Sequence, residues 1–422
     1  MVKVTVNSID IDVEDGITVL QACEDAGVEI PRFCYHERLA IAGNCRMCLV
    51  EITGQPKLAA SCAMPVAEGM VIATNTDRVR KARKGVLELL LLNHPLDCPI
   101  CDQGGECDLQ DQVVAYGCGI GRYREDKRAV SKKAFGPLIE NSMNRCIHCT
   151  RCVRFLSDVA GTYELGTFGR GEKMEIDSCI SHGITSEISG NIIDLCPVGA
   201  LTSKPYMFKA RPWELFHCDT IDVLDAVGSS VRVDCRGLNV MRVLPRLNED
   251  VNEEWISDKT RFACDGLEVQ RLTDPCLRVG GRLMPKGWDF AVSVVIDKIK
   301  SVGGSSVAAI SGDLVDCESM FLLKKFMECI GSEIMDCRQD GAKLVASSRG
   351  MYVFNTSIAG IEEADLCLLI NADIRFDAPV INARLRKRYL TGAIKIASVG
   401  CKFSYNYEVD RLGDDLGILE EI

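Results

Sequence analysis

The sequence predicts two fold classes in one chain, α+β in the first half and α/β in the last part. Three observations predict them. The first 93 residues combine alternating, strand-like stretches with two stretches of helical periodicity. Residues 94–212 have few long periodic segments and are rich in Cys, Gly and Asp. Beyond about residue 280, short apolar runs ending in Gly, Asn or Asp alternate with helical stretches, which is typical of a parallel sheet.

The N-terminus begins with a predicted hairpin. Apolar residues alternate with polar ones over 2–6 and again over 9–13, on either side of Asn7-Ser8. Thr18 and Gln21 then have the spacing of a capping box, so a helix is expected to start there. A hairpin followed by a helix is the expected opening of the first domain.

Two more strands and a second helix complete this region. Strand-like stretches cover residues 48–52 and 70–73. A helix is predicted from Asp77, because apolar residues recur there at helical spacing, and it must end near Asn93 because Pro95 follows.

The last part of the chain carries the α/β signal. The apolar runs 307–312, 366–371 and 394–400 are short enough for buried strands, and residues 317–329 have helical periodicity. We therefore expect βαβ units there.

The charge of the chain excludes some classes of partner. Lys and Arg number 49 and Asp and Glu 60, a net charge of −11 over 422 residues. Nucleic acids and anionic lipids need a basic surface, so neither is expected as a principal partner. No apolar run approaches the roughly 18 to 20 residues that a membrane span requires.

Cysteine is the unusual component, with 23 residues. A disulfide scaffold is not expected, because the count is odd, the chain is long and no secretory signal is recognised. We expect reduced thiols, many of them bound to metal.

The first cysteine group follows the predicted hairpin and helix. A Cys-x2-Cys pair with two outlying cysteines suits a two-iron cluster, although the first gap is longer than in plant-type ferredoxins. Four thiolates also suit tetrahedral zinc, so the spacing favours iron–sulfur and leaves zinc open. The group comprises Cys34, Cys45, Cys48 and Cys62.

The second group stands where Pro95 breaks the second helix. One imidazole and three thiolates suit zinc or a four-iron cluster with one histidine ligand. A histidine beside a proline more often caps a helix or lies at the surface, but three cysteines within the next thirteen residues favour ligation. The group comprises His94, Cys98, Cys101 and Cys107.

The third group has the most specific spacing. Three cysteines separated by two residues each, with a remote Cys-Pro, have the pattern of bacterial four-iron ferredoxins. A tetrahedral zinc site could not use all three without strain. The group comprises Cys146, Cys149, Cys152 and Cys196.

Other residues near these groups are interpreted more simply. Arg145, Arg151 and Arg154 either offset the charge of a thiolate-bound cluster or form a solvated helix face. Three cysteines outside the spacing are interpreted as packing residues: Cys23, Cys118 and Cys179. No dinucleotide fingerprint, Walker lysine or nucleophile-and-base set is found, so no catalytic residue is predicted. Three redox centres without a substrate site indicate an electron relay.

At this point the motifs resemble a known family, the large iron–sulfur subunit, designated G, of respiratory complex I, the NADH-quinone oxidoreductase. The resemblance extends through at least Asp265-Gly266 and rests on long motifs, which are Pro31-Arg-Phe-Cys-Tyr-His-Glu37, Gly43-Asn-Cys-Arg-Met-Cys48, Asn93-His-Pro-Leu-Asp-Cys-Pro-Ile-Cys-Asp-Gln-Gly-Gly-Glu-Cys107, Arg145-Cys-Ile-His-Cys-Thr-Arg-Cys-Val-Arg154 and Gly190-Asn-Ile-Ile-Asp-Leu-Cys-Pro-Val-Gly-Ala-Leu201.

The resemblance implies one 2Fe-2S cluster at the first group and 4Fe-4S clusters at the other two. It implies electron transfer from the subunit that binds NADH and FMN toward quinone-side iron–sulfur subunits. The expected location is the peripheral arm of complex I, on the cytoplasmic face of a bacterial inner membrane or the matrix side of the mitochondrial one.

The resemblance also implies the domain organisation. Residues 1–77 are expected to form a β-grasp, two-iron ferredoxin-like domain, 78–118 a His/Cys3-ligated four-iron domain and 130–212 a four-iron ferredoxin-like domain. Residues 213–422 resemble a molybdopterin-oxidoreductase domain, expected to be structural. Its end at Ile422, short of the family's usual length, indicates natural shortening or a fragment.

The sequence departs from some relatives at an additional cluster motif. Residues 218–228 hold only Cys218, and Cys264 stands alone near the fourth position. Neither an additional cluster nor molybdopterin is expected. Two alternatives stay open: a diaphorase-type iron–sulfur subunit of a soluble hydrogenase or formate dehydrogenase, and a zinc-stabilised scaffold without a redox role.

Overall fold

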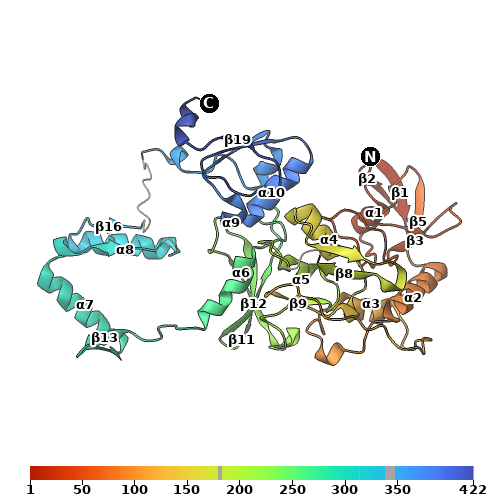
Figure 1. Cartoon of the computed structure of the whole chain (residues 1–422), viewed down its shortest axis with the longest axis horizontal. Helices are drawn as coiled ribbons and strands as arrows, with labels where there is room; N and C mark the ends of the chain where they lie inside the picture. The colour runs from red at the N-terminus through yellow and green to blue at the C-terminus, as the bar shows by residue number, and fades with distance from the viewer. Residues whose placement is uncertain (179–182, 313, 338–346, 422) are drawn as a thin grey trace. The chain divides into compact units, whose positions relative to one another are not determined.

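The structure is a computed structural model, and it describes residues 1–178, 183–312, 314–337 and 347–421. The chain forms two compact units, one of Met1–Cys264 with Ile358–Ile422 and one of Asp265–Ser357 (Figure 1). Each unit is described by itself. No helix within the described residues is both long and apolar enough to cross a membrane.

The N-terminal domain is built on a mixed five-stranded sheet of order β2-β1-β5-β3-β4. The predicted hairpin is confirmed, with Asn7 and Ser8 at φ 46° and 73° in its turn. The only parallel pair among these strands is β1 with β5. The strands are β1 (Val2–Val6), β2 (Ile9–Val13), β3 (Leu49–Ile52), β4 (Ala59–Ala60) and β5 (Met70–Ala73).

Helix α1 (Val19–Asp25) covers this sheet. Its predicted capping box is present, since Thr18 and Gln21 hydrogen bond reciprocally. The apolar side of the helix, with Val19 and Leu20, is buried in one core with Val4, Val6 and Ile72 of the sheet. This core also contains Cys48 and Cys62, so the first cysteine group is fixed to a rigid domain.

The cysteine-rich middle has short elements joined by loops, as expected for a region without long periodic segments. Strand β6 pairs with β9, and β7 with β8, both antiparallel. The elements are α2 (Asp77–Leu91), α3 (Asp108–Tyr116), β6 (Ile139–Asn141), α4 (Arg151–Arg154), β7 (Leu165–Phe168), β8 (Glu175–Ser178), α5 (Asn191–Leu195) and β9 (Leu201–Ser203).

An antiparallel sheet, β10-β11-β12, follows this region. Its small core joins Val231 and Val243 to Ile256, and the helix α6 contacts β12. The elements are β10 (Phe216–Ile221), β11 (Ser230–Arg236), β12 (Asn239–Pro245) and α6 (Asp258–Phe262).

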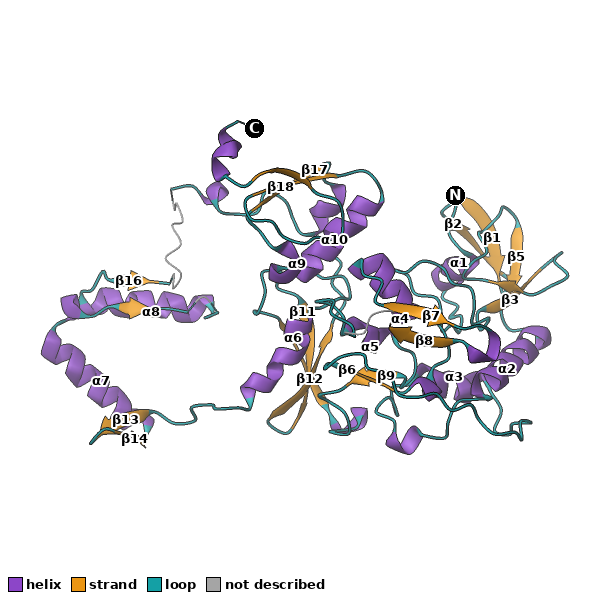
Figure 2. Cartoon of the chain, viewed as in Figure 1, coloured by secondary structure: helices purple, strands orange, loops and turns teal. Residues whose placement is uncertain are grey.

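The rest of the first unit is a parallel sheet, β17-β18-β19, with helices α9 and α10 on it (Figure 2). Leu385 of α10 packs against Leu369 and Ile396 of the sheet. Other residues of α10, including Val380 and Ala383, belong to the core that holds the cysteines of the third group. The elements are β17 (Leu366–Ile370), α9 (Ile374–Asp377), α10 (Pro379–Leu390), β18 (Lys395–Val399) and β19 (Asp410–Gly413).

The second unit contains a hairpin, two helices and a short parallel pair, β15 with β16. The parallel pairs here and in the first unit confirm the α/β prediction, although the run 307–312 yields only a two-residue strand. The elements are β13 (Cys276–Val279), β14 (Arg282–Pro285), α7 (Trp288–Val302), β15 (Ala309–Ile310), α8 (Cys317–Ile330) and β16 (Met335–Asp336).

Candidate metal centres

The first predicted group, here called site 1, is brought together by the sheet and the preceding loop. Cys48 directly precedes β3, and Cys62 is the second residue after the paired strand β4. This pairing brings Cys48 Sγ to 3.4 Å from Cys62 Sγ. The loop supplies Cys34 and Cys45, and Gly43 there adopts a φ of 61°. This turn lets the backbone N–H groups of Asn44 and Cys45 donate to the Cys34 sulfur.

The thiols of site 1 interact strongly with one another. Hydrogen bonds donated by neighbouring thiols lower the pKa of Cys34 to about 2 and that of Cys48 to about 6. The same hydrogen bonds raise the pKa of the donors, Cys45 and Cys62. These hydrogen bonds link all four sulfurs of site 1, so the four predicted ligands converge. Thiolate is the form of cysteine that binds metal.

The second group, site 2, surrounds one cavity of about 150 Å³ that His94, Cys98, Cys101 and Cys107 all line. The end of α2 positions His94, and Cys107 is the residue just before α3. Backbone N–H groups of Leu109 and Gln110, in the first turn of α3, donate to the Cys107 sulfur. One water molecule needs about 10 to 15 Å³ of cavity volume. The cavity of site 2 therefore has room for a group much larger than one ion.

Two details of site 2 fit a bound cluster. The His94 Nδ1 atom is buried without a hydrogen-bond partner, and a buried polar atom left unpaired is costly unless it binds a ligand. Burial also lowers the pKa of His94, which favours the neutral imidazole that ligates metal. The second detail is Gly199, whose lack of a side chain leaves room for the sulfur of Cys101. An added Cβ at this position would stand 2.1 Å from Cys101 Sγ.

The third group, site 3, lines an apolar pocket of about 20 Å³ with all four of its cysteines. His148 and Thr150 have φ of 55° and 60°, and these turns wind the chain around the pocket. The His148 N–H lies 3.4 Å from Cys146 Sγ. Burial raises the pKa of Cys146 to about 12 and raises those of Cys149, Cys152 and Cys196. These thiols need a neighbouring cation to ionise, and bound iron would supply it.

Site 3 is in contact with both of the other sites. Arg154 Nη2 donates to the carbonyl oxygens of both Cys34 in site 1 and Cys149 in site 3. The thiol of Cys107 in site 2 donates a hydrogen bond to the carbonyl oxygen of Pro197, 3.7 Å away. Pro197 is the residue directly after Cys196 of site 3. Site 3 therefore contacts both other sites, although it comes last in the sequence.

The three arginines near site 3 are not a solvated helix face. Arg145 pairs with Asp97 at 3.0 Å beside site 2. Arg151 donates to the carbonyl oxygens of Tyr35 and Leu195. Tyr35 is next to Cys34 of site 1, and Leu195 is next to Cys196 of site 3. With Arg154, they place positive charge among the three sites. The sequence left their role open, because spacing along one helix does not show what packs against it.

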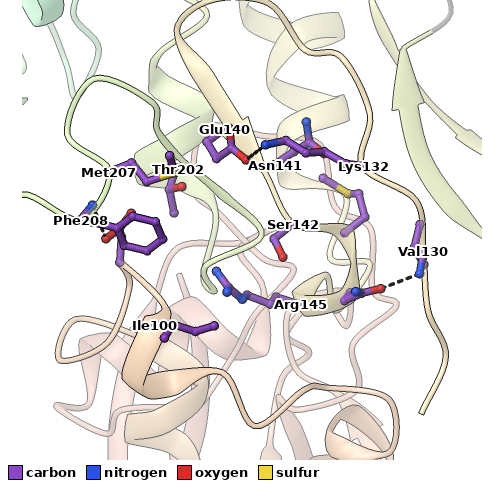
Figure 3. Close-up of a pocket in the computed structure, with 13 residues that line it drawn as sticks. Ile100, Val130, Lys132, Glu140, Asn141, Ser142, Arg145, Thr202, Met207 and Phe208 are labelled. Carbon is purple, nitrogen blue, oxygen red and sulfur yellow. Dashed lines mark hydrogen bonds and ion pairs between the residues drawn. The ribbon is translucent and has the colours of Figure 1, made fainter. Parts of the chain in front are cut away.

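A further pocket of about 240 Å³ borders sites 2 and 3 (Figure 3). Arg145, which also lines site 2, extends into it, and Met143, which also lines site 3, belongs to its wall. Lys132 and Glu140 form an ion pair at its side. No cysteine or histidine lines this pocket, so it adds no candidate ligand to the two sites.

The cysteines outside these groups are mixed in their surroundings. Cys23 is fully buried in the N-terminal core, as predicted, and burial raises its pKa to about 11. The packing prediction is wrong for Cys118, which is exposed in the loop after α3. Cys179 lies outside the described residues.

A geometric condition for a single metal ion is not met anywhere in the described residues, the three sites included. No three His, Cys, Asp or Glu side chains there converge closely enough to hold one ion.

Five family models match successive parts of the chain. They are the 2Fe-2S iron–sulfur cluster binding domain (1–77), the NADH-ubiquinone oxidoreductase-G iron–sulfur binding region (83–122), the ferredoxin-like domain of NADH-quinone oxidoreductase subunit 3 (136–202), the NDSU1/NuoG-like 4Fe-4S domain (215–265) and molybdopterin oxidoreductase (271–422). The fold and these matches define an iron–sulfur protein with two-iron and four-iron binding domains.

The relatives are more specific. The NADH-quinone oxidoreductase subunit designated G in Rickettsia bellii is 56% identical over all of this chain and 62% of its own length. The mitochondrial NADH-ubiquinone oxidoreductase 78 kDa subunit of Candida albicans is 57% identical over 99% of this chain and 59% of its own. The chain is similar to these NADH-quinone oxidoreductase subunits over its whole length, and it spans about three fifths of the length of these relatives.

A solved structure also matches. An NAD⁺-reducing [NiFe]-hydrogenase in the H₂-reduced state is 29% identical, with a TM-score of 0.46, over 50% of this chain and 90% of that chain. The 4Fe-4S model over 215–265 covers a stretch in which this chain has three cysteines, Cys218, Cys235 and Cys264. The absence of an additional cluster there stays a prediction.

Proposed function

We propose that the chain is an electron-transfer subunit of an NADH-quinone oxidoreductase, with one 2Fe-2S cluster at site 1 and 4Fe-4S clusters at sites 2 and 3. When bound, such clusters accept and release single electrons. The chain's own residues supply the ligands, and in all three sites backbone N–H groups donate to sulfur. Hydrogen bonds of this kind are among the determinants of a cluster's potential.

One observation carries the proposal, the continuous contact from site 1 through Arg154 to site 3 and onward through residues 196–199 to site 2. Electron tunnelling falls steeply with distance, so three centres placed in direct sequence serve a relay. A scaffold that used metal only for stability would gain nothing from such an order.

The proposal includes the partners and the location. The electron donor is the subunit that binds NADH and FMN, the acceptors are iron–sulfur subunits on the quinone side, and the chain lies in the peripheral arm. The chain's negative charge and the lack of a membrane-spanning helix in its described part are compatible with this position.

Rapid-freeze EPR tests the relay. The oxidised chain is mixed anaerobically with less than one equivalent of dithionite and frozen at increasing times. We expect electrons to redistribute among three cluster signals at a rate that is independent of protein concentration, because the transfer is intramolecular. Redistribution whose rate rises in proportion to concentration would contradict the relay, since it would require collisions between molecules.

Replacing His94 with alanine should alter one EPR signal and leave the other two, because only site 2 contains this imidazole. The matched control is His217→Ala, at an exposed position on β10. Three unchanged signals in the His94 variant would exclude His94 as a ligand.

A further inference from the structure

A short helical segment connects site 3 to a distant part of the chain. Helix α4 begins beside the site with Cys152 and Arg154, and it continues as the π turn Phe155–Ala160. The segment 151–160 is thus one continuous helical stretch of ten residues. Any change in its tilt or rotation therefore displaces a predicted ligand at one end, together with the arginine that joins site 1 to site 3.

The far end of this segment is held by residues more than 220 positions away. Arg386 of α10 donates from Nη2 to the Ser157 carbonyl at 3.0 Å. Asn406, in the loop before β19, donates from Nδ2 to the Ala160 carbonyl. The two are themselves joined, because Arg386 Nη1 donates to the Asn406 carbonyl. The parallel-sheet region, which contributes no predicted ligand, thus caps the helix that carries Cys152.

The next residue, Gly161, shows how closely this cap is fitted. It ends the segment with a φ of 73°, and an added Cβ would lie 2.6 Å from Arg386 Nε. Arg386 is 7% exposed, and its guanidinium lies against the backbone where the helix stops. The last carbonyls of a helix lack partners within it and carry partial negative charge, so a buried guanidinium there is both a donor and a favourable charge.

We propose that Arg386 and Asn406 are positioning residues for site 3. By fixing the C-terminal end of segment 151–160, they fix where Cys152 and Arg154 lie at its other end. This inference rests on the proposed function, because it assigns the parallel-sheet region a role in tuning one cluster. Arg386 and Asn406 do not touch the site, so their influence must pass through the helix.

The test uses the full chain with its clusters, in which Arg386→Gln removes the charge and one of the two donor groups. We expect the EPR line shape and midpoint potential of one four-iron cluster to shift, the cluster whose signal is lost in Cys152→Ala. The signals of sites 1 and 2 should stay as in the unmodified chain. Arg386→Lys, which keeps the charge, should shift the line shape and the potential less than Arg386→Gln does.

The matched control is Arg388→Gln on the same helix. Arg388 donates to the Ala364 and Glu363 carbonyls, within the parallel-sheet region, and should leave all three signals unchanged. Asn406→Ala removes a single hydrogen bond and should give a smaller shift in the same direction, which keeps the test open if Arg386→Gln does not fold.

Two results would overturn the proposal: three unchanged signals in a folded, iron-replete Arg386 or Asn406 variant, or the same shift in the Arg388 control. The unmodified chain separates this test from that of the proposed function. If that chain holds no clusters, the proposed function fails before any variant is measured. If it shows three signals, only the positioning role is at stake.

Discussion

Replacing Cys152 with alanine should remove about four irons per chain, abolish one four-iron EPR signal and interrupt electron exchange between the other two clusters. The physical reason is that site 3 contacts both site 1 and site 2. Cys152 is buried among three other thiols of the site, and the described residues that line its pocket include no further cysteine and no histidine. Iron analysis and rapid-freeze EPR on the purified variant measure both effects.

The control for this variant is Cys23→Ala, another buried cysteine, which lies in the N-terminal core and belongs to none of the three sites. It should retain every iron and all exchange. A Cys152 variant with full iron content, or with undisturbed exchange between sites 1 and 2, would show that site 3 is not the central link.

Replacing Gly199 with alanine should eliminate the cluster of site 2 while the other two remain. The added Cβ would stand 2.1 Å from Cys101 Sγ and 3.2 Å from Gln103 Cβ, so the thiol must move out of its ligating position. Overpacking of this kind costs roughly 1 to 3 kcal/mol in folding stability, less than the whole stability of a domain of ordinary size. We therefore expect a folded chain that lacks about four irons.

Gly119→Ala is the matched control, because an added Cβ there would meet nothing within 4 Å. It should leave iron content and melting temperature unchanged. If Gly199→Ala keeps the site 2 signal with its original line shape, the close approach of residues 196–199 to Cys101 does not shape this site.

Local patterns allowed much of the fold to be predicted. The hairpin around Asn7-Ser8 and the capping box of Thr18 depend on neighbouring residues, and both are present. The three cysteine groups were also recognisable, because a cluster draws several ligands from one short loop. The structure brings together all four residues of sites 2 and 3 around their cavities and links the thiols of site 1 by hydrogen bonds.

What could not be predicted depends on contacts between distant residues. The contact between sites 1 and 3 depends on Arg154, which joins loops more than 100 residues apart, and no local pattern encodes it. Cys118 was expected to be buried, but burial is decided by what packs over a loop, and this loop is exposed. Gly199 belonged to a recognised motif, yet its steric role appears only when Cys101 is placed beside it.

The most direct test of the account is the content of iron, acid-labile sulfide and zinc in the full chain after anaerobic purification, with low-temperature EPR before and after reduction. We expect about ten irons per chain, a matching amount of sulfide and three cluster signals on reduction. About six irons would identify one failed four-iron site. Stoichiometric zinc with little iron would contradict the account as a whole.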